Sequence, residues 1–168
     1  CVPYLMNYIY IVYDTERCPI DITCYNDLIR PEMAGQIGSI DGARNLFPMA
    51  LIALGYDPNS TKESEIKEAY EWLTFNQIHE DSYSVSVTLP YYNKNVVAYG
   101  ATQENIVNGT ISCMLTYDGN ASWAMNELGE NNTLTIAPFT NDPVQLGFDL
   151  FVVPKGAKHI DLAHKFLN

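Results

Sequence analysis

Strand-like and helix-like segments alternate along most of this 168-residue chain, and this order constrains the fold more than any other feature. Residues 4–13 are almost entirely aromatic and β-branched, which predicts a strand buried on both faces. Another strand is predicted at residues 36–40. The helix predicted directly after it carries apolar residues at the spacing of one helical face, namely Ala43, Leu46, Phe47, Ala50, Leu51 and Leu54.

The rest of the chain continues the alternation. Residues 66–73 predict a second amphipathic helix, and residues 77–95 predict an irregular surface excursion. Further strands are predicted at 96–99, 111–117, 134–137 and 148–153, with helices at 102–107, 122–128 and from 160 onward. The pattern indicates an α/β domain with a largely parallel or mixed sheet. In such sheets, ligands bind at the carboxyl ends of strands, beside helix N-termini.

The charge balance excludes one class of partner. Acidic residues outnumber basic ones 20 to 9, giving a formal net charge of -11, and the few Lys and Arg residues form no stripe. Such a field repels nucleic acid. It attracts cations, although many soluble proteins are equally acidic. No apolar run reaches the roughly 18 residues needed to span a bilayer.

Residues suited to catalysis or metal binding form no recognisable pattern. The four cysteines lack the spacing of zinc ligands, and Cys113 lies within a predicted strand, as a core thiol does. His159 and His164 are five residues apart, so a helix turns them away from each other. No glycine-rich phosphate loop is present. The sequence therefore predicts no catalytic residue, no metal site and no cofactor.

Three of the cysteines leave alternatives open. Cys18 and Cys24 either close a small loop as a disulfide outside the cytoplasm or remain buried thiols. Cys1 is either the lipid-bearing first residue of a mature lipoprotein or the point at which a longer sequence was cut.

Several sequence runs resemble, in the same order, the spermidine/putrescine-binding proteins of ABC importers. They begin with Pro-Glu-Met-Ala-Gly-Gln-Ile at 31–37 and with the segment at 41–61 that contains Asp-Gly-Ala-Arg-Asn, followed by Glu-Ile-Lys-Glu-Ala-Tyr at 65–70. The remaining runs lie at residues 108–112, 117–121, 148–158 and 161–167. Each motif is moderately specific, and the shared order over nearly the whole chain carries the resemblance.

The resemblance implies a fold and a role. The fold is a three-layer α/β lobe of the type II periplasmic-binding-protein class. Residues 1–168 form a single lobe, the second of a two-lobed clamshell whose first lobe is absent. The implied role is to capture a small solute, a polyamine or a similar cation, for an ABC permease at the periplasmic or extracellular face of the membrane. Membrane association arises only through an anchor or the permease.

The resemblance also implies a ligand-binding set. Asp149 matches a family ligand carboxylate, and Tyr117 stands where the family usually has a Trp that packs on the polyamine. The set is completed by Asp41, Asn45, Phe148 and Asp118. Protonated amines favour such carboxylates and ring faces. From its position, Asp41 is also the expected N-cap of the helix that follows it.

Some positions depart from the family pattern. Two carboxylates that reach the amine in the family are replaced by Gly42 and Asn45, an aromatic is replaced by Gly147, and a Trp-Gly pair is replaced by Met6-Asn7. Three hypotheses therefore remain: a lobe that binds a polyamine or similar cation, the same clamshell with a neutral or anionic ligand, and a permease-attached interaction domain with no solute.

Overall fold

The computed structural model describes residues 1–40, 42–74, 96–100, 102–139 and 142–167. Its strands are β1 (Val2–Asp14), β2 (Ile37–Ser39), β3 (Val96–Tyr99), β4 (Cys113–Tyr117), β5 (Leu134–Ile136) and β6 (Gln145–Phe151). Its helices are α1 (Ala43–Ala53), α2 (Glu63–Leu73), α3 (Thr102–Val107), α4 (Asp118–Leu128) and α5 (Ile160–Leu167), with 3-10 turns η1 (Tyr25–Ile29), η2 (Pro31–Met33) and η3 (Gly129–Asn131). These elements match the predicted alternation, and the excursion predicted at 77–95 lies outside the described residues.

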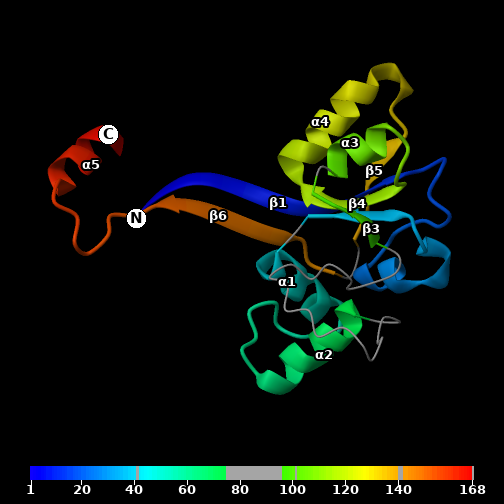
Figure 1. Cartoon of the computed structure of the whole chain (residues 1–168), viewed down its shortest axis with the longest axis horizontal. Coiled ribbons are helices and arrows are strands. Elements are labelled where there is room, and N and C mark those ends of the chain that lie inside the picture. Colours follow the sequence, from blue (N-terminus) through cyan, green and yellow to red (C-terminus); the bar gives the residue numbers. More distant parts are fainter. Residues whose placement is uncertain (41, 75–95, 101, 140–141, 168) are drawn as a thin grey trace.

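The sheet is mixed. Its order is β3-β2-β4-β1-β5, and β6 pairs with the first half of β1. Strand β2 runs parallel to β3 and β4, whereas β1 runs antiparallel to β4, β5 and β6. Helices α1 and α2 cover one face of the sheet, and α3 and α4 cover the other (Figure 1). The predicted three-layer α/β lobe is therefore confirmed.

Alternation along β1 divides the core into two halves. Ile9, Ile11 and Tyr13 pack with α1 and α2 on one face, while Val12 packs with α3 and α4 on the other. Successive strand residues point to opposite faces, so a strand covered on both sides must be apolar at every position. Residues 11–13 meet this condition, being apolar and buried, and the strand ends at the buried, hydrogen-bonded Asp14.

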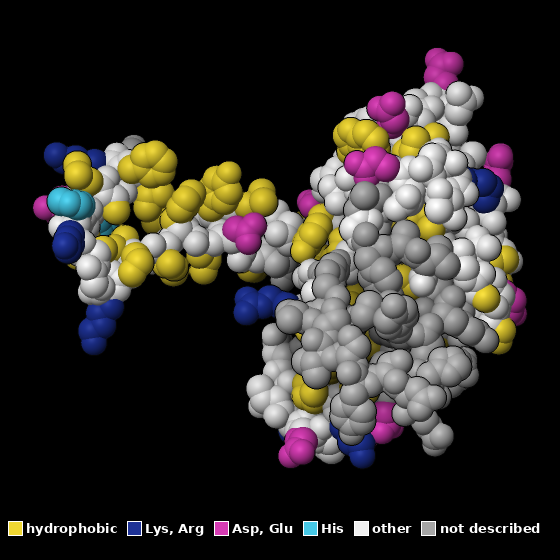
Figure 2. Space-filling model, in the orientation of Figure 1, with side chains coloured by type: hydrophobic (Ala, Val, Ile, Leu, Met, Phe, Trp, Pro, Cys, Tyr) yellow, Lys and Arg dark blue, Asp and Glu magenta, His cyan; other side chains and the backbone are white. Residues whose placement is uncertain are grey.

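The first half of β1 leaves the body of the protein. It forms a two-stranded antiparallel ribbon with β6, and the ribbon ends beside α5, well away from the other helices (Figure 1). The prediction that residues 4–13 are buried on both faces is wrong for this half, because none of the described helices covers the ribbon and Tyr4 is 68% exposed. Figure 2 shows apolar side chains along the ribbon and α5. The exposed apolar residues of this region are Val2, Tyr4, Leu5, Met6, Leu146, Phe148, Leu150, Phe151, Val152, Val153, Ile160, Leu162 and Phe166.

The strand directions define one edge of the sheet, which we call the carboxyl edge. The parallel strands β2, β3 and β4 all end at this edge, and α1, α3 and α4 begin there. The ribbon leaves the sheet at the same edge, since Tyr117 at the end of β4 pairs with Ile9 of β1. This is where ligands bind in open α/β sheets.

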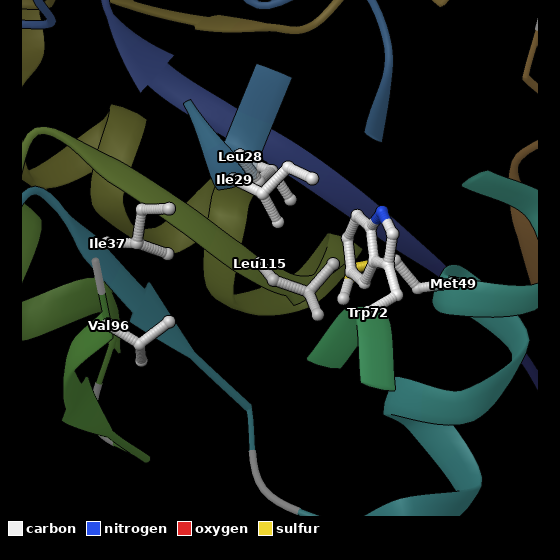
Figure 3. Close-up of a pocket in the computed structure, with 7 residues that line it drawn as sticks. All are labelled: Leu28, Ile29, Ile37, Met49, Trp72, Val96 and Leu115. Atoms are coloured by element: carbon white, nitrogen blue, oxygen red, sulfur yellow. The ribbon is translucent and has the colours of Figure 1, made fainter. Parts of the chain in front are cut away.

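An apolar void lies inside the lobe, between the sheet and α1–α2. Its volume is about 10 Å³, and its walls are Leu28, Ile29, Ile37, Met49, Trp72, Val96 and Leu115, as Figure 3 shows. A space of this size without polar partners does not hold a water molecule stably. It is a packing gap of the core and not a solute site.

None of the described helices has the length and apolar content needed to cross a bilayer.

Asp14 fixes the far end of β1. Its carboxylate is buried and accepts hydrogen bonds from Arg17 Nε at 2.7 Å, from Thr133 Oγ1 at 2.9 Å and from the backbone N–H groups of Glu16 and Arg17. Burial alone would raise the pKa of Asp14, but these hydrogen bonds outweigh it and lower the pKa below its usual value.

We expect Asp14→Asn to lower the free energy of unfolding by about 1–3 kcal/mol at neutral pH. Because the folded-state pKa of Asp14 is lowered, its contribution is present above the unfolded-state pKa near 4 and is lost as pH falls through the folded value. Urea unfolding of both proteins between neutral and acidic pH measures this. Exposed Asp57→Asn is the control, and equal losses for both variants would contradict the prediction.

Tyr25 places its ring in the core and leaves its hydroxyl without a described hydrogen-bond partner. The side chain is fully buried and packs on Phe139 with ring centroids 4.6 Å apart. Among the described residues its hydroxyl oxygen has no partner with hydrogen-bond geometry. Burial raises the pKa of Tyr25 to about 12, while the nearby Gln145 side chain acts in the opposite direction.

Tyr25→Phe is expected to change the free energy of unfolding by less than about 1 kcal/mol, since it removes a hydroxyl without a described partner. Tyr25→Ala removes the ring and should cost about 3–5 kcal/mol. The raised pKa means that the stabilisation from neutral Tyr25 is complete below pH about 10 and is lost as pH rises through 12. Urea unfolding at neutral and alkaline pH tests both statements, and a cost above about 2 kcal/mol for Tyr25→Phe at neutral pH would reveal an unseen partner.

Candidate functional site

The predicted ligand residues Tyr117 and Asp118 lie at the carboxyl edge, where β4 passes directly into α4. Tyr117 is the last residue of β4 and the N-cap residue of α4, and Asp118 is the first residue of that helix. Asp118 Oδ1 accepts a hydrogen bond from the Gly119 N–H at 3.0 Å. A carboxylate in the first turn of a helix is stabilised by the exposed amides and the helix dipole.

The structure brings Asn45 and Tyr117 together. Asn45 lies in the first turn of α1, and its Nδ2 donates a hydrogen bond to the Tyr117 hydroxyl at 3.0 Å. This contact joins the start of α1 to the end of β4. Asp41, the other residue predicted near this helix, lies outside the described residues, and the described N-cap residue is Gly42.

Gly42 has a backbone conformation that an acidic residue adopts only with strain. Its φ is 105°, in the region that glycine populates readily and side-chain-bearing residues avoid. The missing carboxylate at this position is therefore linked to the local backbone. A simple Gly42→Asp substitution would strain the start of α1.

Asp149 lies on the ribbon, on the same sheet face as Tyr117. It pairs with Leu5, Gly147 pairs with Asn7, and Tyr117 pairs with Ile9. Paired residues share a face and every second residue returns to it, so these side chains project toward the α1 side. Asp149 is four residues along β6 from the partner of Ile9, roughly 13 Å at about 3.4 Å per residue.

Phe148 is placed differently from the other predicted residues. It pairs with Met6 and therefore projects from the opposite face of the ribbon, away from Tyr117 and Asp149. Its side chain is 58% exposed. Within this chain Phe148 and Asp149 do not face the same side of the ribbon.

Asn7 lies beside Asp149, although it was not among the predicted ligand residues. Its Nδ2 lies 3.5 Å from Asp149 Oδ2, and its Oδ1 lies over Gly147, where an added Cβ would overlap it. Gly147 is thus the cross-strand space into which the Asn7 amide fits. The sequence signal was present, because both residues depart from the family pattern, but only the strand register shows that they face each other.

The edge carries charges of both signs, because the carboxylates of Asp118 and Asp149 lie there and so does Arg44, which is exposed in the first turn of α1. In the part of the chain that the structure describes, neither Asp149 nor Asp118 forms an ion pair. A protonated amine would therefore meet carboxylates that no described cation neutralises. The edge also carries neutral hydrogen-bonding groups. The Asn7 amide lies beside Asp149, and the Asn45 amide is bonded to the Tyr117 hydroxyl.

The cysteines and acidic residues offer no other chemistry among the described residues. No group of three or more His, Cys, Asp or Glu side chains there is arranged to hold a metal ion. All four cysteines are free thiols, so Cys18 and Cys24 are not paired. Burial raises the pKa of Cys113 well above its ordinary value, which keeps this thiol protonated and unsuited to act as a nucleophile.

Comparisons with known proteins find relatives in sequence and in fold. The spermidine/putrescine-binding periplasmic protein 1 of Haemophilus influenzae is 26% identical over 148 residues, which cover 87% of this chain and 36% of that protein. A structure from Listeria monocytogenes assigned to a spermidine/putrescine ABC transporter is 28% identical, with a TM-score of 0.70, and covers 99% of this chain and 46% of that one. A spermidine/putrescine ABC transporter substrate-binding protein of Streptococcus pneumoniae has the same fold, with a TM-score of 0.67 at 24% identity, and this chain covers 46% of it.

The matches define the class of protein. This chain spans less than half the length of the solved structures it matches and about a third of the Haemophilus relative. The relatives are named as spermidine/putrescine-binding periplasmic proteins and as a substrate-binding protein of an ABC transporter, which agrees with the predicted location. The family model for bacterial extracellular solute-binding proteins matches residues 1–168. The chain therefore belongs to the bacterial extracellular solute-binding protein family.

Proposed function

We propose that this chain is one lobe of a two-lobed clamshell that binds a small cationic solute for an ABC permease. The observation that carries the proposal is the shared face of Asp149 and Tyr117 at the carboxyl edge of the sheet. Asp149 supplies a carboxylate for an ammonium group, and the Tyr117 ring supplies a face for a cation or its alkyl chain. The Asn45 amide holds the Tyr117 hydroxyl from the other side.

The apolar ribbon supports the two-lobed arrangement. Thirteen large apolar side chains of the ribbon and its continuation to α5 are exposed, although monomeric proteins rarely expose a patch so extended. The matched structures are about twice as long as this chain. In our proposal the body of the lobe lies between Ile9 and Gln145, while the ribbon and α5 pack against the other lobe.

The ribbon also explains how a cleft arises. It leaves the sheet at the edge that carries Tyr117, so a second lobe attached to it faces that edge. A solute between the lobes then contacts both, and closure about the two strands encloses it. Tyr117, Asn45 and Asp149 form this lobe's share of the wall.

A neutral or anionic solute is the second candidate, and one observation favours it. The start of α1 carries Gly42 and Asn45, so this helix contributes no described carboxylate to the edge. Exposed amides at a helix N-terminus suit an uncharged or negative group better than an amine. Asp149 and Asp118 weigh against this candidate, because an anion at the edge would meet two carboxylates that form no described ion pair, although Arg44 in the first turn of α1 brings one positive charge to the same edge.

The isolated 168-residue chain is expected to bind spermidine with a dissociation constant in the millimolar range, about 4 kcal/mol or less of binding free energy. One lobe supplies only part of the contacts while the ligand is still immobilised, so little net free energy remains. Calorimetry and chemical-shift titration measure this. Submicromolar binding by this chain alone would show that the site is complete without another lobe.

Asp149→Asn keeps the shape of the site and removes its charge. In a protein that carries both lobes, it should weaken a cationic ligand by about 1.5–3 kcal/mol, the range for a hydrogen bond to a charged group, and leave a neutral ligand nearly unaffected. Asn45→Glu should strengthen polyamine binding, since a carboxylate is tolerated in the first turn of a helix. Titrations with spermidine and putrescine measure both effects, and Asp57→Asn, at an exposed position in the body of the lobe, is the control. If all variants bind polyamines equally, the cationic proposal is wrong.

A further inference from the structure

We propose that Asn7 determines the specificity of this site, by binding a hydroxyl group on the carbon next to the ammonium-bearing carbon of the solute. This inference rests on the proposed function, since it requires that Asp149 binds an ammonium group. The preferred ligand class is then a vicinal amino alcohol, with its ammonium on Asp149 and its hydroxyl on the Asn7 amide.

The first support is the position of the Asn7 amide. Its Nδ2 is 3.5 Å from Asp149 Oδ2, at the long limit of a hydrogen bond, so the two groups lie side by side without a strong mutual contact. Both project from the α1 face of the ribbon. The Asp149 side chain is exposed and the Asn7 side chain is half-buried, so a solute approaching this face reaches both groups.

The second support is that Gly147 makes room for this amide. Asn7 and Gly147 are direct partners across the ribbon, and a Cβ on residue 147 would overlap Asn7 Oδ1. Any larger residue at 147 would displace the amide from Asp149. The position of the Asn7 amide therefore depends on the absence of a side chain at residue 147.

The chemistry follows from the two neighbouring groups. The carboxylate accepts from an ammonium group, and the amide has a second N–H to donate and an oxygen that accepts. One carbon–carbon bond separates the carbons that bear the ammonium and the hydroxyl in a vicinal amino alcohol. Both groups of such a ligand can therefore reach partners 3.5 Å apart at the same time.

A plain alkyl diamine fits less well at this point. Its methylene groups would cover the Asn7 amide and exclude water without replacing the lost hydrogen bonds. Covering a polar group without a partner opposes binding. The Asn7 amide therefore discriminates between the two ligands in two ways. It forms a hydrogen bond with the hydroxyl of the amino alcohol, and it loses its hydrogen bonds to water when an alkyl diamine covers it.

The test uses a ligand pair that differs by one hydroxyl. We would titrate the isotopically labelled 168-residue chain with 1,3-diaminopropane and with 1,3-diamino-2-propanol, following the amide signals of Asn7, Tyr117 and Asp149 by NMR. The expected result is half-saturation by the hydroxylated diamine at about three- to tenfold lower concentration, the effect of one neutral hydrogen bond.

Two variants remove the preference by different routes. Asn7→Ala deletes the amide, and Gly147→Ala leaves it in the chain but displaces it by steric overlap. Both should bind the two diamines at equal concentrations. Asn126→Ala, on an exposed position of α4, is the matched control and should keep the preference.

The outcomes separate this inference from the function on which it rests. If 1,3-diaminopropane binds the parent chain as tightly as its hydroxylated analogue, or if the preference survives in both variants, Asn7 does not set specificity while cation binding at Asp149 stands. If neither diamine shifts the signals around Asp149, and neither diamine binds a protein that carries both lobes, the cationic function itself is wrong.

Discussion

The structure depends on the backbone pairing of one long strand. Strand β1 is bonded to β4 and β5 within the body and to β6 beyond it, so a single segment of 13 residues crosses from a buried environment to an exposed one. Before Asp14, its second half is apolar on both faces because helices cover both. The buried Asp14 network fixes its far end, and the register from there determines which side chains face the α1 side as far as Leu5, beyond which the pairing with β6 is irregular.

Much of this fold could be predicted from sequence, because apolar periodicity reports burial. The helical stripe after residue 43 and the strand at 113–117 were predicted within a few residues, since packing against a common core imposes those patterns. The ribbon was mispredicted because Tyr4 and Leu5 are as apolar as core residues. Periodicity shows that a segment needs a partner, and it does not show whether the same chain supplies that partner.

The candidate site was predictable in part, for a different reason. Tyr117 and Asn45 could be placed at one edge because strand ends and helix starts meet there in α/β sheets. The contribution of Asn7 depends on cross-strand register, and no local pattern states that residue 7 faces residue 147. The positive φ of Gly42 was equally hidden, because a glycine in a sequence does not reveal the sign of its φ.

The ribbon that carries Asp149 has a mechanical consequence. Two strands joined by one ladder of hydrogen bonds resist twisting far less than the body of the sheet, where each inner strand has two neighbours. Any rotation between two bodies joined in this way is concentrated in that ladder. A solute held by Asp149 and Tyr117 would contact both the flexible ribbon and the rigid body of the sheet. It would therefore restrict twisting of the ribbon relative to the body.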